Sequence, residues 1–401
     1  MKTNRLLLPL LLAPLLLAGF VPDSLIKSLF RDAEQQTRFM LAEVTKVTQE
    51  SSGKKPALVS PRTLDKAGAL QLVPARDWTS GFFPGELWYL YEYTGQREWA
   101  ELARRYTANL ESEKMNAGTH DMGFKLYCSY GNGYRLTGDA TDKAIIIQGA
   151  RTLIKRFKPT AGIIRSWDHH KDVWQCPVII DNMMNLELLF AATRLTGDST
   201  FYKIAVTHAK TTIKNHYRPD NSSYHVVDYD TLTGKVIKKN THQGYSDESA
   251  WSRGQAWGLY GYTMCYRETK DPQFLKQAEA IAHYMLNHPH MPADLVPYYD
   301  FDAPGIPSEP RDVSAAAIMA SALYELSTYV PKALYRAKAD QVITSLAKGD
   351  RSPIAQNHGF LLAHSTGSKT SEIDVPLVYA DYYFLEALLR SKKLNEKKPL
   401  F

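Results

Sequence analysis

Hydrophobic and polar positions along the chain define two kinds of helical segment that alternate. The first kind is amphipathic, as in the segment where Met40, Val44 and Val47 recur at steps of three or four. This spacing places the apolar side chains on one face of a helix and leaves the other face polar. The predicted amphipathic helices span 31–50, 97–113, 141–157, 199–216, 272–288 and 332–348.

The second kind of segment is apolar or aromatic nearly all round, as a helix buried on most faces must be. Its members span 78–94, 121–137, 180–196, 251–268, 312–328 and 375–391. Turns such as Thr137-Gly138-Asp139 and Thr196-Gly197-Asp198 join the two kinds. In such turns the Gly closes one helix in the left-handed conformation and the Asp caps the next helix.

These repeats predict helical hairpins, six inner helices and six outer ones. The fold class is therefore all-α, an (α/α)6 toroid that occupies residues 23–401 as a single domain. Little β structure is expected, with hairpins near Tyr224–Ile237 and Leu295–Phe301.

The N-terminus predicts an exported protein. Lys2 and Arg5 precede an unbroken apolar run from Leu6 to Phe20, and polarity returns at Asp23. A basic start followed by about 15 apolar residues is typical of a secretory signal peptide and is too short for a membrane span. We assign residues 1–22 to this leader and expect a periplasmic or secreted protein without a membrane anchor.

Composition narrows the function further. The 401 residues include 48 Lys and Arg against 42 Asp and Glu, and 44% are hydrophobic, which is typical of a globular protein. No concentrated basic stripe follows the sequence, so nucleic acid is not an expected partner. The sequence does not specify an oligomeric state.

Cysteine and histidine usage argues against a metal site. The three cysteines, Cys128, Cys176 and Cys265, sit among apolar or aromatic neighbours and form no CxxC pair. At most one disulfide can form within the chain. His169-His170 lie beside Asp168, but no further ligand follows at a metal-binding spacing.

Charged residues or Trp stand at the head of each predicted inner helix. All inner helices of a toroid start at the same rim, so these residues should converge on one mouth. N-capping is an alternative explanation for Asp77, Asp312 and Asp374. Capping does not explain the Trp residues at the same level, and aromatic rings with carboxylates around a concave mouth are typical of a carbohydrate site. The residues concerned are Asp77-Trp78, His120-Asp121, Asp181-Asn182, Trp251-Ser252-Arg253, Arg311-Asp312, Glu372 and Asp374.

Asp181 is the strongest candidate for a catalytic acid. It lies in Val178-Ile179-Ile180-Asp181-Asn182-Met183-Met184, where apolar neighbours should desolvate the carboxyl and raise its pKa. Asp121 is the second candidate, and a buried structural cap is the alternative for both. His225 and Gln243 are polar side chains beside aromatic residues, for which an ordinary structural role is equally compatible with the sequence.

Four ordered motifs resemble those of the unsaturated glucuronyl hydrolases, glycoside hydrolase family 88. The resemblance spans about residues 75–390. The motifs are Asp77-Trp78-Thr79-Ser80-Gly81-Phe82, His120-Asp121-Met122-Gly123-Phe124, Ile180-Asp181-Asn182-Met183-Met184-Asn185 and Trp251-Ser252-Arg253-Gly254-Gln255-Ala256-Trp257.

The resemblance implies a reaction on the products of polysaccharide lyases, which carry a 4,5-unsaturated uronic acid at the non-reducing end. The family removes this sugar by hydrating its vinyl-ether double bond. The residue matching Asp181 acts as general acid and then as base, and the position matching Asp121 supports it. No metal or organic cofactor is implied. The positions that match the substrate subsite are His225, Gln243, Arg253 and Trp257, with Trp78, Trp167 and Trp251 as aromatic walls.

A distal subsite for sulfate is a further possibility within the resemblance. Some family members show Ser-x-x-Ser-x-Lys near the C-terminus, and this chain has Ser365, Ser368 and Lys369, with the Lys one place early. A surface loop without sulfate binding is the alternative.

Three other functions fit parts of the pattern. The related unsaturated rhamnogalacturonyl hydrolases share the toroid and the chemistry, but the Arg-Gly-Gln-Ala-Trp stretch favours the glucuronyl family. A polysaccharide lyase on the same toroid would need a base poised at C5, for which no motif is found. A periplasmic glycan-binding protein would gain nothing from a desolvated carboxyl such as Asp181.

Overall fold

The computed structural model describes residues 20–51, 53, 56–330 and 333–401. Most of the predicted leader, residues 1–22, therefore lies outside the described residues. The first helix begins directly after it, at Asp23.

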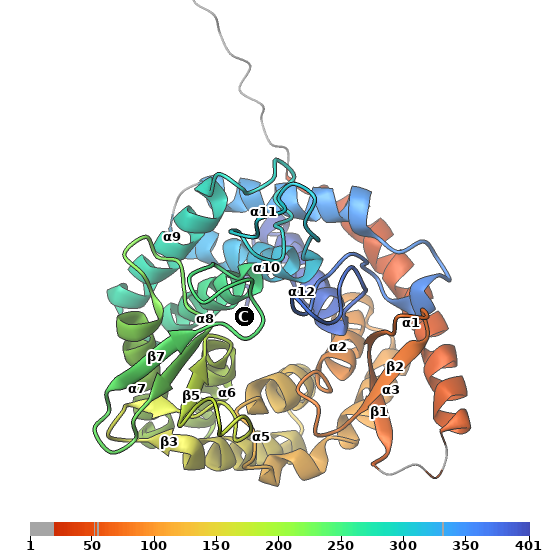
Figure 1. Cartoon of the computed structure of the whole chain (residues 1–401). Coiled ribbons are helices and arrows are strands. Elements are labelled where there is room, and N and C mark those ends of the chain that lie inside the picture. The colour runs from red at the N-terminus through yellow and green to blue at the C-terminus, as the bar shows by residue number, and fades with distance from the viewer. Residues whose placement is uncertain (1–19, 52, 54–55, 331–332) are drawn as a thin grey trace, which may run out of the picture.

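Helices form two concentric layers around one axis, as the sequence predicts (Figure 1). The inner helices contact one another in a closed ring, and each outer helix follows or precedes its inner neighbour along the chain. The outer layer consists of α1 (Asp23–Glu50), α3 (Arg97–Ala108), α5 (Ala140–Leu153), α7 (Ser199–His216), α9 (Pro272–Asn287) and α11 (Ala333–Ser345). The inner layer consists of α2 (Phe82–Thr94), the π-helix η2 (Gly123–Gly131) with α4 (Asn132–Thr137), α6 (Asn182–Thr196), α8 (Ser252–Thr269), α10 (Val313–Tyr329) and α12 (Val378–Asn395).

The turns between inner and outer helices have the predicted conformation. Gly138 and Gly197 end their helices with φ of 70° and 76°, in the left-handed region that favours glycine. Asp139 and Asp198 then accept hydrogen bonds from the first backbone N–H groups of α5 and α7. These turns lie at the rim opposite to the one where the inner helices begin.

Strands occur in connections that lead from an outer helix to the next inner helix, so they gather at the rim where inner helices begin. A hairpin precedes α2, and a three-stranded antiparallel sheet in the order β5-β6-β7 flanks α6 and α8. The predicted hairpin near Tyr224–Ile237 is confirmed as β6 and β7. The strands are β1 (Leu58–Leu64), β2 (Leu70–Pro74), β3 (Phe157–Lys158), β4 (Ile163–Ile164), β5 (Pro177–Ile179), β6 (Val226–Tyr229) and β7 (Val236–Asn240); short 3-10 and π turns are η1 (Glu111–Met115), η3 (Ile154–Arg156), η4 (Leu346–Asp350) and η5 (Asn357–Gly359).

Two of the predicted helices differ from the structure. The first starts at Asp23 rather than at residue 31, because its buried face continues back through Phe30 and Ile26 to the proline that precedes the helix. The segment 121–137 is a π-helix followed by a short α-helix. Its Phe124 N–H, one of the first donors of the helix and without a partner inside it, donates to the Asn185 side chain of α6 at 3.0 Å.

The hairpin predicted at Leu295–Phe301 is wrong. Backbone groups of this segment bond to other parts of the chain instead of to each other: Phe301 N–H donates to Ala250, and Tyr299 N–H donates to Pro310. The segment therefore joins the loops before α8 and α10 rather than forming strands of its own. The hairpin β1–β2, which the sequence did not reveal, contacts the outer helix α1 and, through β1, the inner helix α12.

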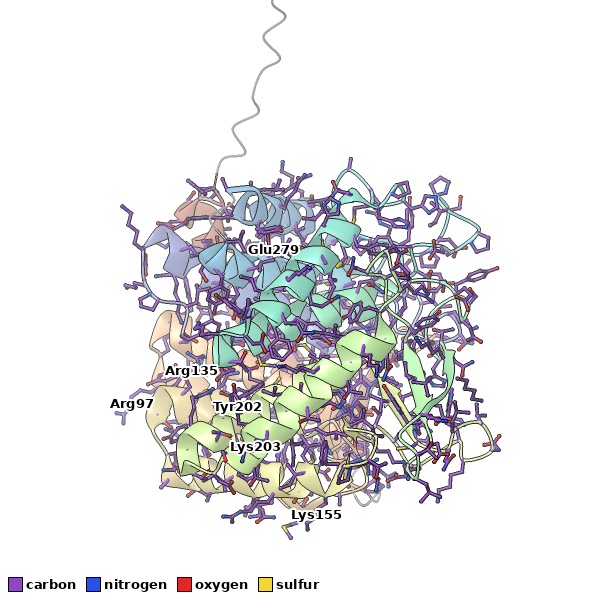
Figure 2. The ribbon with its side chains drawn as sticks, turned by 90° about the vertical axis from the view of Figure 1, so that its left-hand side faces the viewer. Arg97, Arg135, Lys155, Tyr202, Lys203 and Glu279 are labelled. Carbon is purple, nitrogen blue, oxygen red and sulfur yellow. The ribbon has the colours of Figure 1, made fainter. Side chains whose placement is uncertain are left out.

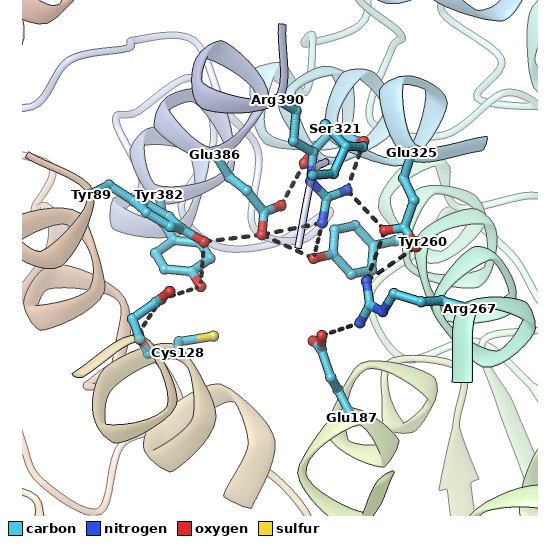
Figure 3. A network of polar contacts seen from close by, with 12 residues as sticks. Tyr89, Cys128, Glu187, Tyr260, Arg267, Ser321, Glu325, Tyr382, Glu386 and Arg390 are labelled. Carbon is cyan, nitrogen blue, oxygen red and sulfur yellow. Dashed lines mark hydrogen bonds and ion pairs between the residues drawn. The ribbon is translucent and has the colours of Figure 1, made fainter. Parts of the chain in front are cut away.

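The far end of the toroid is closed by a network of charged and hydroxyl side chains to which every inner helix contributes (Figure 3). Glu325 of α10 accepts from Arg267 of α8 at 3.0 Å and pairs with Arg390 of α12 at 3.3 Å. Glu386 of α12 accepts from the hydroxyls of Tyr89 and Tyr260 at 3.0 Å. These contacts tie the inner helices together at the rim opposite the strands.

The three cysteines are free and buried, and in the part of the chain that the structure describes no cluster of His, Cys, Asp or Glu could hold a metal ion. Asp168 instead pairs with Arg156 at 2.8 Å. No helix among the described segments is both long enough and apolar enough to cross a membrane.

Candidate active site

A pocket of about 370 Å³ opens at the rim where the inner helices begin. Its walls come from the segments that precede α2, η2 and α6, from strand β5 and from the loops after β7 and before α12. The structure thereby brings together at one mouth residues that lie up to 310 positions apart. The predicted site residues that line the pocket are Trp78, Asp121, Trp167, Asp181, Gln243 and Ser368.

Asp181 lies at the floor of this pocket, at the first position before α6. Its side chain makes no capping hydrogen bond to the helix, so a capping role does not account for it. Burial raises the pKa of Asp181 to about 7, while the charge of Arg253 acts in the opposite direction. The carboxyl can therefore hold a proton near neutral pH and release it to a bound molecule.

His225 faces the same carboxyl with a fixed tautomer. Its Nδ1 accepts backbone N–H bonds from His242 at 3.0 Å and from Gln243 at 3.1 Å, so the ring proton resides on Nε2. Nε2 lies 3.6 Å from Asp181 Oδ2. Burial lowers the pKa of His225 well below its ordinary value, and the neighbouring His242 adds to this effect. The ring is a neutral donor directed at Asp181 and at whatever binds there.

Asp121 is held by two neighbours from its own loop. Thr119 donates its hydroxyl to Oδ2 at 2.7 Å, and His120 Nε2 lies 3.2 Å from Oδ1. The charge of Asp121 raises the pKa of Asp181 further. His120 is buried, which lowers its own pKa. The two carboxyls thus have different environments: Asp121 is partly open to the pocket and held by its neighbours, whereas Asp181 is desolvated.

Aromatic rings form two walls of the pocket. Trp78 lies 4.9 Å from the Tyr379 ring, and Trp167 stacks on His169 with centroids 5.0 Å apart. Trp251 and Trp257 lie behind the pocket instead of lining it. Trp251 packs against His225 at 4.6 Å and so backs the ring that faces the acid.

Buried polar atoms without a hydrogen-bond partner gather around the floor of the pocket. They include Asp181 Oδ2, His225 Nε2 and the indole nitrogens of Trp167, Trp251 and Trp257. Buried polar groups are nearly always paired in native proteins, so a cluster of orphan donors and acceptors indicates a site shaped for a polar ligand. Aromatic faces beside such donors suit a sugar ring.

Arg253 and Gln243 brace the loop that closes one side of the pocket. Arg253 is wholly buried beneath it; its terminal nitrogens donate to Asp312 at 2.8 Å and to the carbonyls of Thr366 and Gly367 at 2.6 and 2.5 Å. Gln243 Nε2 donates to the Gly367 carbonyl at 2.9 Å. The guanidinium is therefore not exposed at the pocket surface. To bind a substrate carboxylate through two hydrogen bonds, it would have to give up its bonds to Asp312, Thr366 and Gly367. Asp312 also caps α10, as one of the alternatives for it predicted.

Comparison with known proteins identifies this arrangement. The profile of Glycosyl Hydrolase Family 88 matches residues 60–384. The chain belongs to Glycosyl Hydrolase Family 88. It is 51% identical over 339 residues to the unsaturated glucuronyl hydrolase of Formosa agariphila, covering 83% of this chain and 85% of the relative. It is a glycosidase.

Solved structures of the family share the toroid. An unsaturated glucuronyl hydrolase described as specific for heparin superposes with a TM-score of 0.87 at 46% identity, covering 94% of this chain and 99% of that one. An aspartate-to-asparagine mutant of the enzyme from Streptococcus agalactiae, complexed with dGlcA-GalNAc6S, gives a TM-score of 0.74 at 27% identity, covering 97% of this chain and 98% of that one.

The three residues of the possible distal subsite do not come together in this member of the family. Ser365 is fully buried and pairs through its backbone with Val375. Ser368 lines the pocket and bonds to Ser371 at 2.9 Å. Lys369 donates its ammonium to the Tyr245 carbonyl at 3.2 Å, and it does not line the pocket.

Sequence reasoning missed several residues that line the pocket. Arg62 of β1 donates to Glu372 at 2.6 and 2.9 Å and to Asp77 at 2.9 Å, which places a charged group on the wall. No local signal could have found this pair, because its members are 310 positions apart and β1 was not predicted. His169 and His242 also line the pocket without having been proposed for the substrate site, whereas His120 was expected at the mouth.

Proposed function

We propose that the enzyme removes a 4,5-unsaturated uronic acid from the non-reducing end of lyase-generated oligosaccharides. The observation that carries the proposal is a buried carboxyl, Asp181, with a pKa of about 7 at the floor of a pocket lined by aromatic rings and orphan donors. The names of its relatives, which include a heparin-specific unsaturated glucuronyl hydrolase, support the same substrate class.

The proposed reaction is hydration of the C4=C5 vinyl ether. Protonated Asp181 delivers its proton to C4, and the ionised carboxylate then accepts a proton from the water whose oxygen bonds to C5. The resulting hemiketal opens to a ketone at C5 and leaves C1 as a hemiacetal, which releases the saturated remainder. His225, neutral and fixed as a donor, stabilises Asp181 while it is ionised. No cofactor is needed for this balance of atoms and charges.

A direct test follows the double bond. Unsaturated disaccharides of heparin and chondroitin, sulfated and unsulfated, should lose their ultraviolet absorbance when the enzyme is added. In deuterated water the early product should carry carbon-bound deuterium at C4, and the saturated glucuronide of the same aglycone should not be cleaved. Loss of absorbance with none of the disaccharides, or a product without deuterium at C4, would refute the proposal.

The role of Asp181 is tested with a matched pair of variants. Asp181→Asn keeps the size of the side chain but cannot donate a proton, and general acid–base catalysis contributes about 10²–10⁴-fold. We expect a loss at the upper end of this range, whereas Asp172→Asn, an exchange at an exposed loop residue, should retain full activity. An Asp181→Asn enzyme with more than about a tenth of wild-type turnover would show that another group donates the proton.

We also propose that residues 1–22 direct export and are removed. The support is the basic start and the apolar run of the sequence. The mass of the N-terminal peptide from protein recovered outside the cytoplasm tests this. An N-terminus that still contains Met1 would contradict it.

A further inference from the structure

We propose that Asp300, which does not line the pocket, is a positioning residue for the active site. Its carboxylate holds the loop of residues 241–249, called the His242 loop below, and the backbone of this loop keeps His225 as a neutral donor facing Asp181. The inference rests on the proposed function, in which His225 stabilises the ionised form of Asp181.

The His242 loop lies at the rim where the inner helices begin. Figure 2 shows the toroid from the side, with Arg135 at the far rim and the strands and irregular loops gathered at the opposite rim. The His242 loop follows β7 directly and ends shortly before α8. His242 and Gln243 of this loop line the pocket, so a displacement of the loop changes the pocket itself.

Asp300 is wholly buried, and its carboxylate accepts hydrogen bonds from the His242 loop. Oδ2 accepts from the Tyr245 N–H at 2.8 Å and from the Ser249 hydroxyl at 2.7 Å, and Oδ1 accepts from the Asp302 N–H at 2.9 Å. Among the residues that the structure describes, no Lys, Arg or His side chain forms an ion pair with Asp300, so these donors compensate its charge. A buried carboxylate is costly unless such donors surround it.

Asp300 is itself fixed to the head of α8. It forms an antiparallel β-bridge with Trp251, and the backbone neighbours of the two residues exchange two hydrogen bonds of 3.0 Å. The ring of Trp251 packs against His225 with centroids 4.6 Å apart. Asp300 therefore lies next to both supports of His225, the indole ring and the His242 loop.

The His242 loop fits against Asp300 without room for a side chain at Gly244. A Cβ built on Gly244 would lie 2.8 Å from Asp300 Oδ2 and 2.7 Å from the Thr241 hydroxyl. The Gly244 N–H donates to this hydroxyl at 2.9 Å, and Asp247 accepts from the Thr241 N–H at 2.8 Å. The loop thus keeps its shape through its own bonds and its position through Asp300.

The His242 loop presents two backbone N–H groups to one ring nitrogen. His225 Nδ1 accepts them from His242 at 3.0 Å and from Gln243 at 3.1 Å. A nitrogen whose lone pair accepts these bonds cannot also bind a proton, so His225 stays neutral. Displacement of the loop would free Nδ1, and His225 would then be able to become a cation 3.6 Å from the Asp181 carboxylate.

A cation at this place would change the acid. It would favour the ionised form of Asp181, which has no proton to donate to C4. Four neighbours oppose the protonation of His225, and ionised Asp181 favours it. The four neighbours are His242, Arg253, His216 and His120. The His242 loop therefore keeps the proton on Asp181 rather than on His225.

Histidine-selective ¹⁵N labelling tests this role without any substrate. Long-range ¹H–¹⁵N spectra show which ring nitrogens carry a proton, and His225→Gln assigns the signals of His225. In the wild-type enzyme Nδ1 should carry no proton between about pH 5.5 and about pH 8, whereas in Asp300→Ala we expect His225 to titrate with a midpoint close to its ordinary pKa of about 6.5.

A control variant and a second test variant complete the design. Asp381 is also buried and accepts two backbone N–H groups of a different loop, at 2.8 and 2.9 Å. Asp381→Ala should therefore also lose stability, but it should leave His225 neutral. Gly244→Ala displaces the His242 loop while Asp300 stays in place, and it should let His225 titrate as in Asp300→Ala. This variant carries the test if Asp300→Ala does not fold.

Turnover of an unsaturated disaccharide shows whether the position of the loop matters to the reaction. At about pH 6, kcat of Asp300→Ala and of Gly244→Ala should fall about tenfold, the size expected when a catalytic group is displaced. KM should stay within about twofold, since the lost interaction acts on the chemical step rather than on binding.

The two measurements separate this inference from the proposed function. A wild-type enzyme that acts on no unsaturated uronide would refute the proposed function, and the spectra of His225 would still test the role of Asp300. A neutral His225 in both test variants, or the same titration in Asp381→Ala, would overturn the role of Asp300 alone.

Discussion

Raising the pH through neutrality should remove the activity of the enzyme, because Asp181 must carry a proton before it can donate one. Burial raises the pKa of Asp181 to about 7, whereas an exposed aspartate would be ionised at any pH above about 5. The reactive form of the free enzyme is therefore the protonated one, and it is lost as the pH rises through this value. The basic limb of kcat/KM should follow the titration of Asp181.

The size of the effect follows from the pKa. With a pKa of about 7, roughly nine-tenths of the enzyme holds the proton at about pH 6 and roughly one-tenth at about pH 8. The value of kcat/KM should fall about tenfold across this interval. The charge of Asp121 raises the pKa of Asp181, so Asp121→Asn should move the midpoint of the basic limb to lower pH.

The assay is the loss of ultraviolet absorbance from an unsaturated disaccharide at a concentration well below KM, at constant ionic strength, between about pH 5.5 and 9. The midpoint is read from the shape of the profile, so a lower absolute rate of Asp121→Asn does not affect it. A profile that stays flat above pH 7, or a midpoint that moves upward in Asp121→Asn, would refute the assignment of Asp181 as the proton donor.

Three further predictions concern buried groups. Burial lowers the pKa of His208 to about 3 and of His216 to about 4, so below pH 6.5 the unfolded chain binds protons that the folded chain does not bind. The contribution of these histidines to the free energy of unfolding should be complete above pH 6.5 and fall by about 2 kcal/mol per histidine by pH 5. Denaturant titrations at several pH values measure this fall. His208→Gln should remove the share of this one histidine, about 2 kcal/mol, from the fall. Glu325→Ala removes one carboxylate from Arg267 and Arg390, which keep Glu187, Glu268 and Glu386 as partners, and should lower the free energy of unfolding by about 1.5–3 kcal/mol, with an unchanged value counting against the network. Arg253→Lys cannot reproduce the bonds to the loop beside the pocket and should lower kcat/KM by about tenfold; unchanged kinetics would show that the loop holds its position without them.

Local patterns of apolar and polar residues were sufficient to predict the helices and their order along the chain. Whether a segment is apolar on one face or all round depends on its own residues, and so do the glycine and aspartate turns at Gly138-Asp139 and Gly197-Asp198, whose hydrogen bonds close within a few positions. The alternation of the two helix types then permits few arrangements other than a toroid. Local patterns failed where the partner is distant, as for the segment Leu295–Phe301, whose backbone N–H groups donate to Ala250 and Pro310.

Some features of the candidate site could likewise be predicted from the sequence, and others depend on the tertiary structure. The sequence by itself determined that Asp181 stands at the head of an apolar helix and that Trp78 and Asp121 occupy the corresponding places, since these are facts of position along the chain. Only the tertiary structure decided that His225 is held as a neutral donor by the backbone of His242 and Gln243, and that Arg253 braces a loop more than 100 residues away. The reason is physical: a pKa, a tautomer or a surface charge depends on the groups within a few ångströms, and folding draws those groups from anywhere in the chain.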